Sequence, residues 1–168
     1  MMNAAPKWNR VSDAEMVRRL ERPAGKIHVI LDTDTYNEID DQFALSYMVR
    51  SVEKLEVKAI YAAPFSNHHS TGPADGMERS YQEILKVLTL LEAEELKEVT
   101  YRGSTGYLPN EDEPVISDAA KDLAERAMQY SAGNPLYVIS IGAITNIASA
   151  ILLNPEITGR IVVVWLGG

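Results

Sequence analysis

Apolar runs alternate with amphipathic stretches along most of the chain. Short runs rich in β-branched residues, typical of buried parallel strands, occupy residues 27–31, 55–63, 99–101, 136–141 and 161–166. Between them, apolar residues recur at helical spacing at about 40–50, 73–91, 120–128 and 144–152. Strands that alternate with helices form right-handed βαβ units. The pattern therefore predicts a doubly wound α/β fold with a mostly parallel, Rossmann-like sheet.

Residues 1–26 precede the first strand and are expected to form an N-terminal extension. In this segment, Ser12 followed by Glu15 is a capping-box pattern, which predicts a short helix over residues 13–22. The segment has no apolar stretch typical of a signal peptide. Residues 27–168 are expected to form a single α/β domain.

The last apolar strand runs directly into Gly167 and Gly168, where the sequence ends. In an open parallel sheet, ligands bind at the carboxyl ends of the strands. A strand this apolar is also normally covered on both faces. We therefore expect the fold to be incomplete at its C-terminus, as in the N-terminal portion of a longer protein. The same strand would favour a homo-oligomer, although truncation explains it equally well.

The net charge of the chain disfavours some classes of binding partner. There are 16 basic and 24 acidic residues, for a formal net charge of −8. Nucleic acid and anionic membranes are therefore disfavoured, because both require a basic surface. No apolar run approaches the roughly 20 residues of a membrane span, and no cysteine is present. These features favour a soluble cytoplasmic protein that acts on a small molecule.

Four aspartates, Asp32, Asp34, Asp40 and Asp41, fall within ten positions directly after the first predicted strand. Clustered carboxylates repel one another unless a cation, a proton or a polyhydroxyl ligand offsets the repulsion. The simpler interpretation is a solvated turn followed by acidic residues at a helix start. Because the cluster lies at the carboxyl end of the first strand of an α/β chain, we favour a functional site.

The segment DTDTYNEIDDQFAL resembles the N-terminal signature of the nucleoside hydrolases, which read D-x-D-P-G-x-D-D-x-x-A-L. Further segments resemble the family in the same order, and they are residues 59–67, GSTGYL at 103–108, SIGAITNIASAILLNPEI at 140–157 and IVVVWLGG at 161–168. One short motif is weak evidence, but five in the correct order are fairly specific. The resemblance covers about residues 27–168.

This resemblance implies a calcium-dependent (Ca²⁺) hydrolase of the N-glycosidic bond in a ribonucleoside or related N-riboside. Asp34 would bind calcium and act as general base toward the attacking water. Asp41 would be a bidentate calcium ligand, and the backbone carbonyl of Ile141 would complete this side of the metal shell. Asp40 would accept hydrogen bonds from the ribose hydroxyls, and Asn67 would lie near the sugar and metal.

Asp32 would be a supporting carboxylate that organises the loop. The loop itself departs from the family pattern, because five residues (35–39) separate the second aspartate from the Asp-Asp pair where the family has three. Tyr36, Asn37 and Glu38 are therefore expected to project from the site loop and to alter substrate choice.

The final calcium carboxylate and the group that protonates the leaving base have no counterpart in this sequence. The histidines do not supply them: His28 lies within a strand and is expected to be structural, and His68 and His69 are expected in an exposed loop. We therefore expect residues 1–168 alone to have little hydrolase activity, even with calcium present.

Two alternatives remain. The segment IHVILDTDT also fits the D-x-D-x-T motif of haloacid-dehalogenase-type phosphatases, with Asp32 as nucleophile, Asp34 as general acid/base, Ser140 as the phosphate-binding hydroxyl and magnesium as the metal. Against this, Asp40 and Asp41 would have no role and no suitable lysine follows. The second alternative is a partial hydrolase fold that binds a sugar or metal without catalysis.

Overall fold

A parallel sheet forms the centre of the protein. The computed structural model describes residues 11–167, so residues 1–10 of the expected N-terminal extension and Gly168 lie outside it. The strands are β1 (Ile27–Thr33), β2 (Leu55–Ala62), β3 (Thr100–Arg102), β4 (Leu136–Ser140) and β5 (Ile161–Trp165). Their order is β3-β2-β1-β4-β5, and every pairing is parallel.

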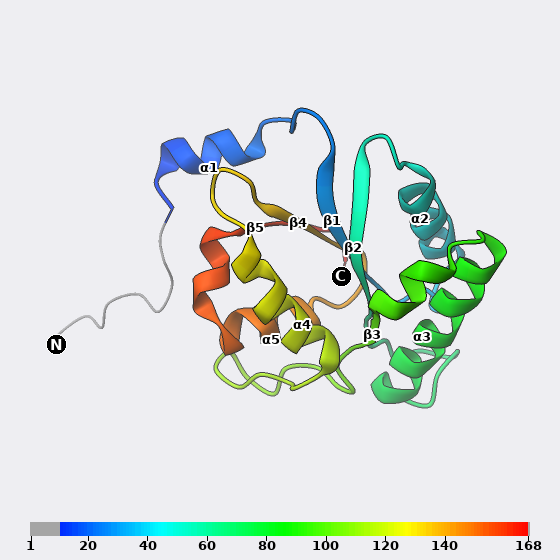
Figure 1. Ribbon diagram of the computed structural model, residues 1–168. Coiled ribbons are helices and arrows are strands. Elements are labelled where there is room, and N and C mark those ends of the chain that lie inside the picture. The colour runs from blue at the N-terminus through cyan, green and yellow to red at the C-terminus, as the bar shows by residue number, and fades with distance from the viewer. Residues whose placement is uncertain (1–10, 168) are drawn as a thin grey trace, which may run out of the picture.

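Helices cover both faces of this sheet. Helices α2 (Ile39–Arg50) and α3 (Pro73–Leu90) lie on one face, and α4 (Asp118–Arg126) and α5 (Thr145–Leu153) lie on the other (Figure 1). The predicted doubly wound α/β fold is therefore confirmed. Because β1 has β2 on one side and β4 on the other, the strand order reverses between β1 and β4. Ligand sites in such sheets lie at this point, beyond the carboxyl ends of the strands.

Alternate side chains of the same strands reach two separate cores. From β1, Val29 and Leu31 pack toward α2 and α3, whereas Ile30 packs toward α4 and α5. All three side chains are essentially inaccessible to solvent. This alternation follows from the two-residue period of a strand. It explains why the first strand is continuously apolar.

The apolar stripe that predicts α2 lies on its exposed side. Ile39, Phe43 and Tyr47 are 69–76% exposed, whereas Leu45 and Met48 are buried. Asp41 lies one helical turn before Leu45 and is buried on the same face. Once Asp41 faces the interior, residues two positions away must face outward. The inward face of α2 thus carries Asp41 together with Leu45 and Met48, and its largest apolar residues face outward.

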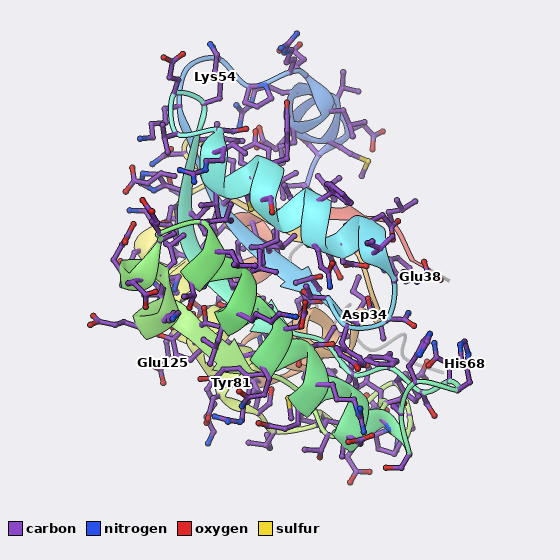
Figure 2. All side chains as sticks on the ribbon, turned by 90° about the vertical axis from the view of Figure 1, so that its right-hand side faces the viewer. Asp34, Glu38, Lys54, His68, Tyr81 and Glu125 are labelled. Carbon is purple, nitrogen blue, oxygen red and sulfur yellow. The ribbon has the colours of Figure 1, made fainter. Side chains whose placement is uncertain are left out.

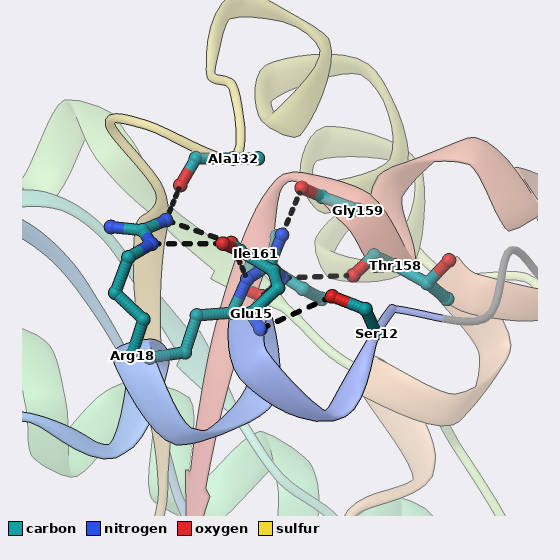
Figure 3. A network of polar contacts seen from close by, with 8 residues as sticks. Ser12, Glu15, Arg18, Ala132, Thr158, Gly159 and Ile161 are labelled. Atoms are coloured by element: carbon teal, nitrogen blue, oxygen red, sulfur yellow. Dashed lines mark hydrogen bonds and ion pairs between the residues drawn. The ribbon is translucent and has the colours of Figure 1, made fainter.

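Helix α1 (Asp13–Leu20) forms where the capping box predicts it, although it ends two residues early. The main-chain N–H of Glu15 donates to the Ser12 hydroxyl at 3.2 Å. The helix buries none of its apolar side chains. Instead, Arg18 donates to the Ala132 carbonyl at 2.7 Å (Figure 3). Arg19 donates to the Gly159 carbonyl at 2.8 Å. Hydrogen bonds to loop carbonyls therefore attach α1 to the sheet.

Short 3₁₀ helices account for most differences from the predicted elements. They are Glu94–Val99, Ala127–Gln129 and Pro155–Gly159. The first displaces the third strand, expected at residues 99–101, to Thr100–Arg102. The second ends α4 before Met128. In residues 11–167, no helix is long and apolar enough to cross a membrane.

Candidate active site

A cavity of about 840 Å³ opens at the carboxyl ends of the strands. Its lining includes the residues that are predicted to bind the metal and the substrate, which are Asp34, Asp40, Asp41, Asn67 and Ile141. Figure 2 shows Asp34 and Glu38 at this end of the molecule, away from Lys54, which precedes β2. The fold thus brings together side chains from the β1–α2 loop, α2 and the loops after β2 and β4.

Asp34 is the first residue of the loop that follows β1, and it is 6% exposed. Its Oδ2 accepts a hydrogen bond from Asn37 Nδ2 at 3.0 Å. Burial raises the pKa of Asp34, and the Asn37 hydrogen bond partly opposes that rise. On its other side lies Gly142, where an added Cβ would be 2.9 Å from both Cγ and Oδ1 of Asp34. Only glycine leaves room for the carboxylate at this distance.

Asp41 lies in the first turn of α2 and is also 6% exposed. Its Oδ1 accepts a hydrogen bond from the Thr33 hydroxyl at 2.6 Å. Burial raises the pKa of Asp41 to about 7, and the neighbouring charges of Asp34 and Asp40 add to the rise. The helix N-terminus favours a carboxylate here. Burial nevertheless leaves its charge largely uncompensated.

Asp32 is fully buried and does not line the cavity. Its two oxygens accept hydrogen bonds from Ser140 Oγ and Asn146 Nδ2, each at 2.8 Å. Burial raises its pKa to about 7 against the effect of these two donors. A nucleophile must reach its substrate, so this arrangement argues against the phosphatase interpretation. The supporting role of Asp32 stays a prediction.

Asn146 connects the ends of several strands and was not singled out in the sequence. Besides Asp32, its Nδ2 donates to the Ala62 carbonyl at 3.1 Å, and its Oδ1 accepts from the Ser104 amide at 2.7 Å. Gly103 fits against it, since an added Cβ would lie 2.4 Å from Asn146 Nδ2. The available signal was the position of Asn146 within the family-like segment at 140–157.

The predicted sugar-binding residues lie at the rim of the cavity. Asp40 and Asn67 are both exposed. His68 and His69 are also exposed, and neither belongs to the cavity lining. His28 lies elsewhere, with Nδ1 3.1 Å from the Tyr130 hydroxyl, as expected for a structural histidine.

The remaining cavity wall is mainly apolar and aromatic. It includes Phe65, Tyr107, Trp165 and Leu166. Tyr107 and Trp165 are 50% and 52% exposed, so their rings are available to a ligand. Trp165 Nε1 donates to the Gly142 carbonyl at 3.0 Å, which orients the indole. Aromatic rings of this kind can stack on a planar heterocycle.

The donor set at the carboxylates fits a hard cation. In residues 11–167, no other residue donates a hydrogen bond to Asp34 Oδ1, Asp41 Oδ2 or the Ile141 carbonyl. Carboxylate and carbonyl oxygens are the ligands that calcium prefers, in sets of about six to eight. Within the same residues, no group of three or more acidic, histidine or cysteine side chains could hold a metal ion. Asp34, Asp41 and the Ile141 carbonyl are fewer oxygens than such a set contains.

Comparison with known proteins agrees with the motifs. The sequence matches the inosine-uridine preferring nucleoside hydrolase family over residues 29–168. Among solved structures, the chain is similar to a purine-preferring ribonucleoside hydrolase from Gardnerella vaginalis, with a TM-score of 0.59 and 22% identity. The match covers 80% of this chain and 46% of that one, so this chain spans less than half of that hydrolase. A search of curated proteins found no match.

Proposed function

Because this chain belongs to the inosine-uridine preferring nucleoside hydrolase family, we propose that it takes part in calcium-dependent hydrolysis of the N-glycosidic bond of a ribonucleoside or related N-riboside. One observation carries the proposal. Three aspartates of the family-like signature, Asp34, Asp40 and Asp41, line the same cavity as Ile141, which comes from a loop about 100 residues later.

Asp34 is proposed to act as the general base. Its carboxylate is largely buried at the cavity wall, where a water molecule can approach it. Burial raises the pKa of this carboxyl, which makes it a stronger base than an exposed aspartate. Asp34 would accept the proton from the water as the water attacks the anomeric carbon.

Asp34, Asp41 and the Ile141 carbonyl are proposed to hold calcium. When bound, calcium would supply Lewis-acid chemistry that lowers the pKa of the attacking water. Its positive charge would also offset the burial that raises the pKa of Asp41 to about 7. The buried carboxylates support this proposal, because they carry charge that a cation would compensate.

The rim and the aromatic wall are proposed to bind the substrate. Asp40 would accept hydrogen bonds from the ribose hydroxyls, and Asn67, which lines the same cavity, would lie near the sugar. The negative charges of the site would stabilise the oxocarbenium-like transition state. Tyr107 and Trp165 would pack against the base. A cytoplasmic location and assembly into a homo-oligomer complete the proposal, and the formal charge of −8 supports a small-molecule substrate.

Replacing Asp34 tests this function. Asp34→Ala should reduce ribose release from inosine and uridine by about 10²–10⁴-fold, the usual contribution of a general base, relative to whatever activity the wild type shows. Asp118→Ala is the control, because Asp118 is exposed and lies in the first turn of α4 away from the cavity. Unchanged ribose release in Asp34→Ala would contradict the assignment.

Magnesium-dependent phosphatase activity that requires Asp32 would favour the phosphatase alternative instead. Binding of calcium and ribose with no turnover would favour a non-catalytic protein.

A further inference from the structure

The β1–α2 loop contains a side chain that contacts two of the proposed site residues. Asn37 belongs to the five residues between Asp34 and the Asp40–Asp41 pair, where the family signature has three. It is partly buried and lines the cavity. Its main-chain N–H donates to the Asp34 carbonyl at 2.6 Å, which closes a tight turn. The side chain of Asn37 is therefore free to act separately from the turn.

The Asn37 side chain bridges Asp34 and Asn67. Its Nδ2 donates to Asp34 Oδ2 at 3.0 Å, and its Oδ1 accepts a hydrogen bond from Asn67 Nδ2. Asn67 in turn accepts the main-chain N–H of His69 at its Oδ1, at 2.8 Å. These contacts form a chain that runs from the loop after β2 to the proposed general base.

The direction of this chain is fixed by its two ends. The His69 N–H can only donate, so it requires the oxygen of the Asn67 amide. The Asn67 nitrogen then faces Asn37 and requires the oxygen of that amide. The Asn37 nitrogen is left to face Asp34, whose ionised carboxylate can only accept. Every group in the series has the partner that its chemistry requires.

We propose that Asn37 is a positioning residue for Asp34, and that Asn67 acts on Asp34 through it. This inference rests on the proposed function and specifies how the carboxylate of that site is held. With Oδ2 engaged by Asn37, Oδ1 is the oxygen of Asp34 that remains for a cation or a water. Gly142 packs against that side of the carboxylate, so Asp34 is fixed from two directions. Outer residues of this kind orient metal ligands and tune their affinity.

Calcium titration of Asn37→Ala tests the proposal directly. The substitution removes the bridge but keeps the main-chain turn, so the thermal unfolding midpoint should stay close to that of the wild type. Isothermal titration should show calcium affinity reduced by about 10–100-fold. Tyr36→Phe is the matched control from the same loop, because Tyr36 lies against Arg79 and outside the cavity lining. Wild-type affinity in Asn37→Ala would overturn the proposal.

A double-mutant cycle tests whether Asn67 works through Asn37. Asn67→Ala should weaken calcium binding in the wild type but add little in the Asn37→Ala background, because the two residues would act in series. Full additivity of the two effects would overturn the series arrangement. It would leave Asn67 as an independent binding residue.

A readout without metal separates this inference from the proposed function. The Asn37 side-chain amide signals can be assigned in a ¹⁵N spectrum by their disappearance in Asn37→Ala. They should shift in Asp34→Ala and in Asn67→Ala, but not in Tyr36→Phe. If the wild type binds no calcium, the proposed cofactor fails, and these shifts still test the bridge. Signals that stay in place in both variants would overturn it.

Discussion

At the amino ends of the strands, the carboxylate of Glu15 accepts hydrogen bonds from Arg18 and Arg19 (Figure 3), whereas at the carboxyl ends Asp32 and Asp41 are buried among neutral donors. The arginines hold the pKa of Glu15 down at about 2. Burial raises the pKa of Asp32 and of Asp41 to about 7. The same chemical group therefore titrates in opposite directions at the two ends.

The cavities at the two ends differ in the same way. The smaller one, of about 320 Å³, is lined by basic residues that include Arg18, Arg19, Arg22 and Lys26. The larger one is lined by Asp34, Glu38, Asp40 and Asp41 with no lysine or arginine. At the amino ends, the charge of Glu15 is already compensated by ion pairs with Arg18 and Arg19 within α1. At the other end, burial disfavours the charged form of Asp41, and a bound cation would favour it again, which is the physical basis of the proposed site.

Adding one methyl group at each end should have very different effects. In Gly142→Ala, the new Cβ would lie 2.9 Å from the Asp34 carboxylate and must displace it, so calcium affinity should fall by about 10–100-fold. In Gly133→Ala, at the amino end, no atom lies within 4 Å of the new Cβ, so affinity should not change. Titration of both variants gives the comparison. Equal affinities would show that the close fit of Asp34 against Gly142 is unimportant.

Stability in the absence of calcium should depend on pH with opposite signs at the two ends. Because the folded pKa of Asp41 is raised from 3.8 to about 7, the folded state keeps a proton that the unfolded state loses. The free energy of unfolding should therefore fall between about pH 4 and pH 8, by up to about 4 kcal/mol from this group. The lowered pKa of Glu15 acts in reverse, so its contribution is lost as the pH falls toward about 2.

Denaturant melts in the presence of a chelator measure this dependence. In Asp41→Asn, the free energy of unfolding should fall less steeply with pH near neutrality. The fall that remains would be due to Asp32, whose pKa is also raised to about 7. Added calcium should also flatten it in the wild type. A fall of the same size in Asp41→Asn and the wild type would show that the burial of Asp41 carries no such cost.

The smallest effect is expected at the amino ends. The Arg19 side chain is 10% exposed and donates to the Gly159 carbonyl at 2.8 Å. Arg19→Ala should lower the free energy of unfolding by about 1 kcal/mol, the usual net value of such contacts, and leave calcium affinity unchanged. Arg22→Ala serves as control, because Arg22 is exposed. A loss of calcium affinity in Arg19→Ala would contradict the independence of the two ends.

Much of the fold could be predicted because strand and helix periods are local. The apolar runs at 27–31 and 136–141 became parallel strands, as the alternation with helices implies, whereas their adjacency in the sheet could not be predicted from that alternation. The orientation of α2 could not be predicted, since Phe43 and Tyr47 form as good an apolar stripe as Leu45 and Met48. Which stripe faces the interior depends on Asp41, whose burial appears only once β1 and the cavity are in place.

Only those site residues that belong to a recognisable sequence motif could be predicted. Asp34 and Asp41 stand out as clustered carboxylates after an apolar strand. The contacts of Asn37 with Asp34 and Asn67 depend on how the longer loop folds, and spacing alone gives no indication of them. Spacing also gives no indication of the contacts of Asn146. This residue lies in α5 and donates hydrogen bonds to Asp32 in β1 and to the Ala62 carbonyl in β2.

Calcium titration of the wild type and of Asp41→Ala decides whether the buried carboxylates hold a metal. The wild type should bind calcium, weakly if only Asp34, Asp41 and the Ile141 carbonyl serve as protein ligands, because the number of charged ligands sets affinity. Asp41→Ala should show no measurable binding, and Asp118→Ala, which changes an aspartate in the first turn of a different helix, should bind calcium like the wild type. Equal calcium affinity in Asp41→Ala and the wild type would contradict the assignment of the metal site.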